Sequence, residues 1–260
     1  EQFEADLKRI TAFYKDRGFP DARVNFAAFG RWDFEGNRTG TGLWNNSNIT
    51  WKDFSSNSFG FYMTAPATNT RATRGGPELA QPAYAEVFGN WNSDSRKALS
   101  WGVGGWVNTN GKNDGGGFGA DVDVTWRPSS NVTLSIGPEY RSIRDGSQFL
   151  RSVGDDLATT FGRRYLFAPL DYTELNATVR LNVTFAPRLT LETFMQPLVF
   201  SSDYGAVHAL ARPRGFDFQP VATTPAPLTQ LDNTLRSVRG NAVLRWEWRP
   251  GSTLYVAWQQ

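Results

Sequence analysis

Alternating apolar and polar residues dominate the chain from Asn25 onward. Between Phe118 and Trp126 every second residue is apolar, and the residues between them are polar or glycine. This alternation is typical of a β-strand with two unlike faces. After a turn at 128–131 the pattern resumes over 132–144 with the same two-faced character. The two segments therefore predict an antiparallel hairpin.

The same alternation over the whole chain predicts eleven strands, with short turns and long connections following each other at successive junctions. We expect strands at 25–35, 42–53, 58–65, 83–92, 98–108, 117–127, 132–144, 172–185, 189–199, 236–248 and 253–260. Short turns are expected at 55–57, 93–97, 128–131, 186–188 and 249–252, and long connections at 66–82, 109–116, 145–171 and 200–235. Arg164–Phe167 look strand-like, but we assign 145–171 to one long loop that contains an extra strand or hairpin.

Short turns at one end and long loops at the other predict an all-β fold, an antiparallel meander that forms a transmembrane β-barrel. Eleven is an odd number and the chain ends at Gln260 rather than at an aromatic residue, so we expect a barrel that lacks at least one strand. Large aromatic residues close to the short turns predict a girdle at a membrane interface, formed by Trp91, Trp126, Phe185 and Trp248.

The opposite faces of these strands carry charges of both signs. We expect them to line the lumen, where neighbouring strands would pair them. One such set of mixed-sign pairs is expected across the hairpin at Pro128. The predicted lumen-facing residues are Asp121, Asp123, Glu139, Arg141, Glu174, Arg180, Arg239, Arg245 and Glu247.

Composition narrows the classes of function. The 27 basic and 25 acidic residues nearly balance, which gives no indication of nucleic-acid binding. The chain has no cysteine, and its one histidine, His208, lies in the longest predicted loop. We therefore expect no metal site, no cofactor, no catalytic residues and no enzymatic activity. Candidate ligand contacts in the long loops are Arg74, His208 and Phe216.

Residues 1–24 differ from the rest of the chain. Leu7, Ile10 and Tyr14 recur at helical spacing, so we expect a short amphipathic helix that Gly18 ends. The stretch resembles part of a POTRA repeat, the periplasmic module of outer-membrane assembly proteins, through the residues Phe13, Tyr14, Gly18, Phe19, Ala22 and Val24. An ordinary amphipathic helix is the alternative. We expect two regions, a POTRA-like helix and turn over 1–24 and a barrel domain over 25–260.

Most of 25–260 resembles a bacterial envelope family, domain of unknown function 5916. The resemblance rests on TRATRGGPEL (70–79), NSDSRKALSW (92–101), WRPSSNVTLSIGPEY (126–140), RYLFAPLDYTELNATVRLNVTFAPRLTLETFMQP (164–197) and LRSVRGNAVLRWEWRPGSTLYVAWQQ (235–260). Members of that family follow a carbohydrate-binding module and are thought to form an outer-membrane barrel. That module does not precede the barrel region in this sequence.

The resemblance implies a barrel in the outer membrane of a Gram-negative bacterium, and we expect it to be non-enzymatic for the reasons of composition given above. Such a barrel would anchor a glycan-binding module and pass small solutes. Its expected partners are outer-membrane lipid, glycans and the machinery that inserts outer-membrane proteins. Two alternatives remain open at this stage: a barrel for outer-membrane protein assembly or two-partner secretion, and a soluble secreted β-sandwich that binds carbohydrate.

Overall fold

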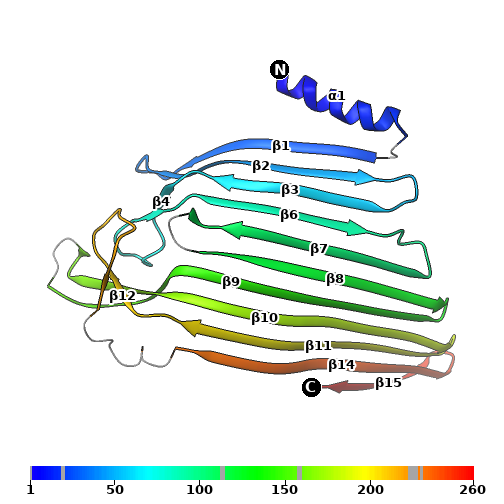
Figure 1. The fold of residues 1–260 in the computed structure, drawn as a ribbon. Coiled ribbons are helices and arrows are strands. Elements are labelled where there is room, and N and C mark those ends of the chain that lie inside the picture. The colour runs from blue at the N-terminus through cyan, green and yellow to red at the C-terminus, as the bar shows by residue number, and fades with distance from the viewer. Residues whose placement is uncertain (1, 19–20, 112–114, 157–159, 222–227, 229–230) are drawn as a thin grey trace.

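One large antiparallel sheet forms most of the protein (Figure 1). The computed structural model describes residues 2–18, 21–111, 115–156, 160–221, 228 and 231–260. The single described helix is α1 (Gln2–Asp16). The strands are β1 (Asp21–Trp32), β2 (Arg38–Thr50), β3 (Ser56–Thr64), β4 (Ala67–Asn69), β5 (Leu79–Gln81), β6 (Tyr84–Asn92), β7 (Leu99–Thr109), β8 (Gly116–Ser129), β9 (Val132–Gly154), β10 (Arg163–Ala186), β11 (Leu189–Tyr204), β12 (His208–Leu210), β13 (Phe218–Pro220), β14 (Asn233–Arg249) and β15 (Ser252–Gln259).

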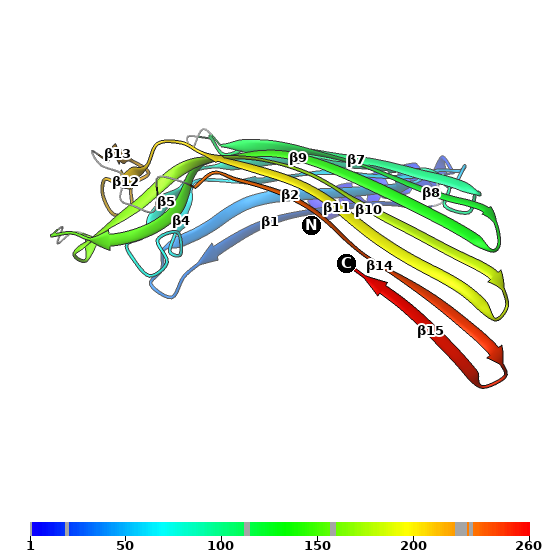
Figure 2. The ribbon, with the colours of Figure 1, turned by 90° about the horizontal axis from the view of Figure 1, so that it is seen from below.

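The sheet is a meander whose strands follow the order β1-β2-β3-β6-β7-β8-β9-β10-β11-β14-β15. The predicted antiparallel all-β fold and its eleven long strands are thus confirmed. Figure 2 shows that the sheet is strongly arched. Among the described strands, however, β1 and β15 are the two edges and do not pair with each other, so the sheet is open rather than a closed barrel.

Cross-strand register gives the sheet one continuous apolar face. In an antiparallel pair, residues directly opposite each other point to the same side. Following these pairs from strand to strand links Trp101, Val124, Ile136, Val179 and Met195 in one row from β7 to β11, and Trp91 and Val122 share this side through Val103. We call this side the apolar face, and the other side the polar face.

The apolar face is the more exposed of the two. On β7, Trp101 and Val103 on the apolar face are 45% and 43% exposed, whereas Ser100 on the polar face is 9% exposed. On β10, Leu175 is exposed while its polar-face neighbours Glu174 and Asn176 are partly buried. Side chains crowd together on the inside of an arched sheet, so we place the polar face on the inside of the arch.

Glycines on the polar face make room for this crowding. The Asp121 carboxylate lies against Gly104, and the Trp106 ring lies against Gly119. A Cβ added at either glycine would come within 3 Å of these side chains. Small residues beneath large neighbours allow a sheet to curve, as in small barrels.

Two sequence predictions need correction. The first two strands begin at Asp21 and Arg38, four residues before their predicted starts at 25 and 42. The turn between them is fixed at Asp33, which accepts hydrogen bonds from the backbone N–H groups of Glu35 and Asn37. In addition, 145–171 is not a separate loop: β9 continues to Gly154, and β10 begins at Arg163. Register shifts between Leu166 and Phe167 and between Ala168 and Leu170 break the alternation that the prediction relied on.

The helix α1 lies beside the edge strand β1 (Figure 1). It ends as predicted near Gly18, whose N–H donates to the carbonyl of Lys15 at 2.9 Å. Phe19, part of the POTRA-like pattern, is outside the described residues. Ala22 and Val24 belong to β1, so the sheet begins before the boundary expected at residue 25. The described part of the chain contains no helix long and apolar enough to cross a membrane.

Candidate functional site

All nine polar residues predicted to line a lumen lie on the polar face. Asp121 is opposite Glu139, which is opposite Asn176 in the next strand. Arg180 places its guanidinium over the Phe194 ring at 4.7 Å, and Arg245 lies 3.8 Å from Glu247. The remaining members of the set share this face through their register positions and their alternation along the strands: Asp123, Arg141, Glu174 and Arg239.

The expected charge pairs across the hairpin at Pro128 do not form. The turn sets a register that puts Asp121 opposite Glu139, two like charges, and puts Arg141 opposite Gly119. Arg141 instead pairs with Glu174 on the neighbouring strand, with 2.6 Å between Nη2 and Oε2. Asn176 then donates to Glu174 at 2.9 Å. The ion pair of Arg141 therefore joins the polar faces of β9 and β10.

The four predicted girdle residues share the apolar face and lie near the short turns. Their exposed fractions range from 36% for Trp91 to 58% for Phe185. Trp248 stacks edge to face with Trp246 at 6.3 Å. Trp126 faces Leu134 across the β8–β9 hairpin. The structure thus brings these aromatic residues to one end of one face.

At the other end, three long connections fold together into a cap. We define the cap as the described residues of 65–83, 145–171 and 205–221. The ends of β9 and β10 extend the sheet there, and β12 pairs with β10 and β13. Buried hydrophobic side chains concentrate in this region. The long loops therefore form a packed unit at one end of the sheet.

One side of the cap is an aromatic cluster. Phe167 is 2% exposed and lies 5.4 Å from the ring of Phe149 and 5.1 Å from that of Phe218. Leu79, from the β3–β6 connection, is buried in the same cluster. The β3–β6 connection therefore reaches past β6, β7 and β8 to pack on the extension of β9 and β10.

The opposite side of the cap has its own apolar cluster. Leu166, the neighbour of Phe167, is completely buried with Val207, Ala209 and Leu228. Consecutive residues of β10 are thus buried on opposite sides. This explains why 163–168 shows no alternation of apolar and polar residues in the sequence.

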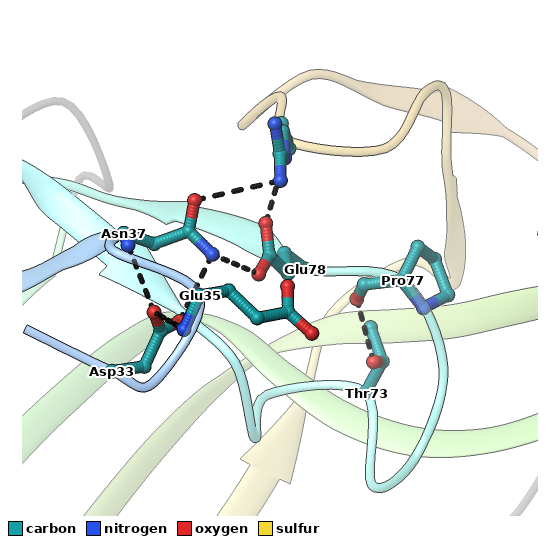
Figure 3. Close-up of polar contacts among 7 residues, drawn as sticks. Asp33, Glu35, Asn37, Thr73, Pro77 and Glu78 are labelled. Carbon is teal, nitrogen blue, oxygen red and sulfur yellow. Dashed lines mark hydrogen bonds and ion pairs between the residues drawn. The ribbon is translucent and has the colours of Figure 1, made fainter.

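A polar network ties the cap to the first hairpin of the sheet (Figure 3). The Glu78 carboxylate accepts hydrogen bonds from Arg214 Nε at 2.7 Å and from Asn37 Nδ2 at 2.8 Å. Asn37 Nδ2 also donates to Asp33 at 2.9 Å. Asn37 lies between β1 and β2, whereas Arg214 lies between β12 and β13. Loops from distant parts of the sheet therefore meet at Glu78.

Replacing Glu78 with alanine is expected to loosen the cap. The change leaves Arg214 and Asn37 without their shared acceptor, and a hydrogen bond to a charged group contributes about 1.5–3 kcal/mol. Trypsin cleavage after Arg214 should therefore become about tenfold faster or more. The matched control is Asp217→Asn, which breaks the exposed pair with Arg212 and should change cleavage little. Equal rates in both variants would rule out this role for Glu78.

The three candidate loop residues all lie in the cap. Arg74 places its guanidinium 5.4 Å from the centroid of the Phe149 ring. Phe216 packs edge to face on Phe218 at 5.2 Å. His208 belongs to β12 and faces Phe167 and Pro220 in the register. Arg74 and Phe216 therefore contact aromatic rings of the cap, and His208 pairs with neighbouring strands there. The sequence alone did not predict these contacts.

Two adjoining cavities lie where the cap meets the polar face. The first, of about 320 Å³, is lined by Arg31, Thr39, Gly40, Tyr62, Thr64, Ala65, Ala67, Gln81 and Tyr84. The second, of about 200 Å³, is lined by Asn69, Ala72, Leu79, Ala80, Gln81, Pro82, Tyr84, Asn110, Asp145, Ser147 and Phe216. Gln81 and Tyr84 belong to both linings, so they stand between the two spaces. No residue of these linings except Phe216 was predicted as a contact.

In the β6–β7 turn, the Asp94 side chain accepts several hydrogen bonds. Asp94 accepts two hydrogen bonds from the Arg96 guanidinium, both at 2.9 Å, and one from the Arg96 backbone N–H at 3.0 Å. The Arg96 guanidinium also covers the Phe54 ring at 3.3 Å. The hydrogen bonds from Arg96 lower the pKa of Asp94 to about 2.

We expect Asp94 to stabilise this turn above pH 4 and to lose that effect as the pH falls toward 2. The unfolded chain binds a proton near 3.8, whereas the folded chain resists protonation until about 2. Asp94→Asn should lower the unfolding temperature at pH 5, and the difference from the parent should shrink at pH 2. A difference that stays constant over this range would contradict the assignment.

The chain matched no family model, no curated protein sequence and no solved structure. Within the described residues, no three or more His, Cys, Asp or Glu side chains cluster in a way that suits a metal ion.

Proposed function

We propose that the chain forms the wall of an outer-membrane β-barrel, with its apolar face against lipid and its polar face against water. The observation that carries the proposal is the reversed exposure of the two faces. A soluble protein buries its apolar face, whereas here Trp101, Val103 and Leu175 are exposed. On the polar face, Asp121, Glu139 and Glu174 are partly buried. Lipid is the solvent that suits such a surface.

The dimensions of the strands support the same proposal. A tilted strand needs roughly ten residues to cross the apolar band of a membrane. Strands β8, β11 and β14 exceed this length with 14, 16 and 17 residues, whereas β3 and β6 have nine each and β15 has eight. β9 has 23 residues and β10 has 24, so the cap extends beyond that band. The girdle residues at the short turns would then mark one interface and the cap would stand beyond the other.

The proposal assigns no reaction to the chain. A wall of this kind separates lipid from a polar interior, and its cap controls what reaches that interior from one side. With the resemblance to domain of unknown function 5916 as support, we also propose that the barrel anchors a glycan-binding module and passes small solutes. Outer-membrane lipid and the insertion machinery are the partners that this role requires.

Two cysteine variants test which face meets lipid. The natural sequence has no cysteine, so Thr178→Cys and Val179→Cys each introduce a unique label at the same depth on opposite faces. After folding into phosphatidylcholine vesicles, a bimane dye on residue 179 should be quenched by nitroxides on the lipid tails. The dye on residue 178 should instead be quenched by iodide in water. Identical quenching at both positions, or a folded monomer that needs neither detergent nor lipid, would overturn the proposal in favour of a soluble sandwich.

A further inference from the structure

The two adjoining cavities beneath the cap are the feature that the proposed wall does not explain. They lie on the polar face, where the β4–β5 hairpin folds over the ends of β2, β3 and β6. Their volumes of about 320 and 200 Å³ together match the size of small-molecule sites, which run from about 300 to 1,000 Å³. Any solute that enters from the capped end would pass them.

The linings consist mostly of neutral groups that donate and accept hydrogen bonds. Amides come from Asn69, Gln81 and Asn110, and hydroxyls come from Thr39, Thr64 and Ser147. The Gln81 side chain is exposed, and no described side chain is hydrogen-bonded to its amide. An amide has two donors and an acceptor with two lone pairs, which suits a ligand with adjacent hydroxyl groups.

Aromatic rings provide the apolar part of the site. Tyr62 and Tyr84 stand edge to face with 5.9 Å between their centroids. Phe216 lines the second cavity from the cap. Flat rings with a polar rim favour ligands that have both C–H surfaces and hydroxyl groups.

Charge argues against an ionic ligand. Apart from the two tyrosines, the ionisable residues among the lining groups are Arg31 and Asp145, one basic and one acidic, in different cavities. Arg31 lies over the Phe29 ring at 5.3 Å, and Asp145 accepts a hydrogen bond from the Ser147 N–H at 3.0 Å. Phosphate recognition normally uses several cations or a row of backbone N–H groups.

We propose that these cavities bind a neutral oligosaccharide, with Gln81 and Tyr84 contacting the sugar at the point where the cavities meet. The inference goes beyond the proposed wall, because binding by the folded protein in detergent does not depend on insertion into a membrane. Failure of either experiment therefore leaves the other result standing.

Calorimetry on the full chain folded in detergent tests this site. The probes are maltotetraose, cellotetraose and xylotetraose, with glucose 6-phosphate as the anionic comparison. We expect at least one tetrasaccharide to bind and glucose 6-phosphate to bind more weakly. The Tyr84 hydroxyl donates to the Glu86 carboxylate at 2.5 Å, so it is available to a sugar only as an acceptor. Gln81→Ala and Tyr84→Phe should each weaken that binding about tenfold, because the first removes the amide and the second removes this acceptor.

Thr178→Ala is the matched control, since it changes the same polar face outside both cavities, and it should leave affinity unchanged. Each variant is first shown to be folded by its shift in a heat-modifiability gel. The proposal is overturned if none of the three tetrasaccharides binds. It is equally overturned if binding survives both cavity variants, or if Thr178→Ala weakens binding as much as they do.

Discussion

Arginine in place of Val122 or Val179 is expected to prevent stable insertion of the protein into a membrane. Both residues lie on the apolar face near the middle of their strands. A charged residue facing lipid at the midplane costs about 2–4 kcal/mol, and the surrounding face of Val103, Ile136 and Met195 offers no compensating charge. In a heat-modifiability gel, the folded band of each variant should be greatly reduced.

Thr125→Arg and Thr178→Arg are the matched controls, because these residues belong to the same strands but point to the polar face. Their charge would meet water and the existing polar side chains, so the folded band should persist. If all four variants insert equally well, the apolar face does not contact lipid and the barrel wall is refuted.

Phe167→Ala is expected to unfold the cap while leaving the sheet intact. Phe167 is 2% exposed and packs between Phe149 and Phe218, and truncating a buried phenylalanine typically costs about 3–5 kcal/mol. The buried apolar contacts of the cap are confined to two small clusters, so this loss should be local. Hydrogen exchange of amides in 145–156 and 205–221 should accelerate strongly, whereas 172–186 should keep its protection.

Leu175→Ala provides the control on the same strand. Leu175 is 51% exposed on the apolar face, so its truncation removes little buried contact. Exchange in the cap should match that of the parent protein. Uniform acceleration along the whole chain in Phe167→Ala would show that cap and sheet unfold as one unit.

The sequence predicted the sheet well because one physical rule governs most of it. Where one face is apolar and the other polar, alternation reveals the strand, as between Phe118 and Trp126. The rule fails where both faces are buried. Tyr165 and Leu166 pack into opposite clusters of the cap, so the sequence shows an unbroken apolar run and the continuation of β10 looks like a loop.

The candidate sites were less predictable, because they depend on contacts between residues distant in sequence. Asn37, Glu78 and Arg214 meet only because the β3–β6 connection crosses several strands to reach the cap. Gln81 and Tyr84 become cavity residues for the same reason. Arg74 and Phe216 were identified as loop residues, but their shared location in one packed unit follows from the aromatic cluster alone.

The meander also determines what kind of seam can close this sheet. With an odd number of antiparallel strands, β1 and β15 run in the same direction, from the short turns toward the cap. Joining these two edges directly would create a parallel ladder with slanted hydrogen bonds, unlike every other pairing between neighbouring strands of the sheet. One additional strand running the opposite way would instead be antiparallel to both edges. The direction of the edge strands thus favours closure by an odd number of added strands.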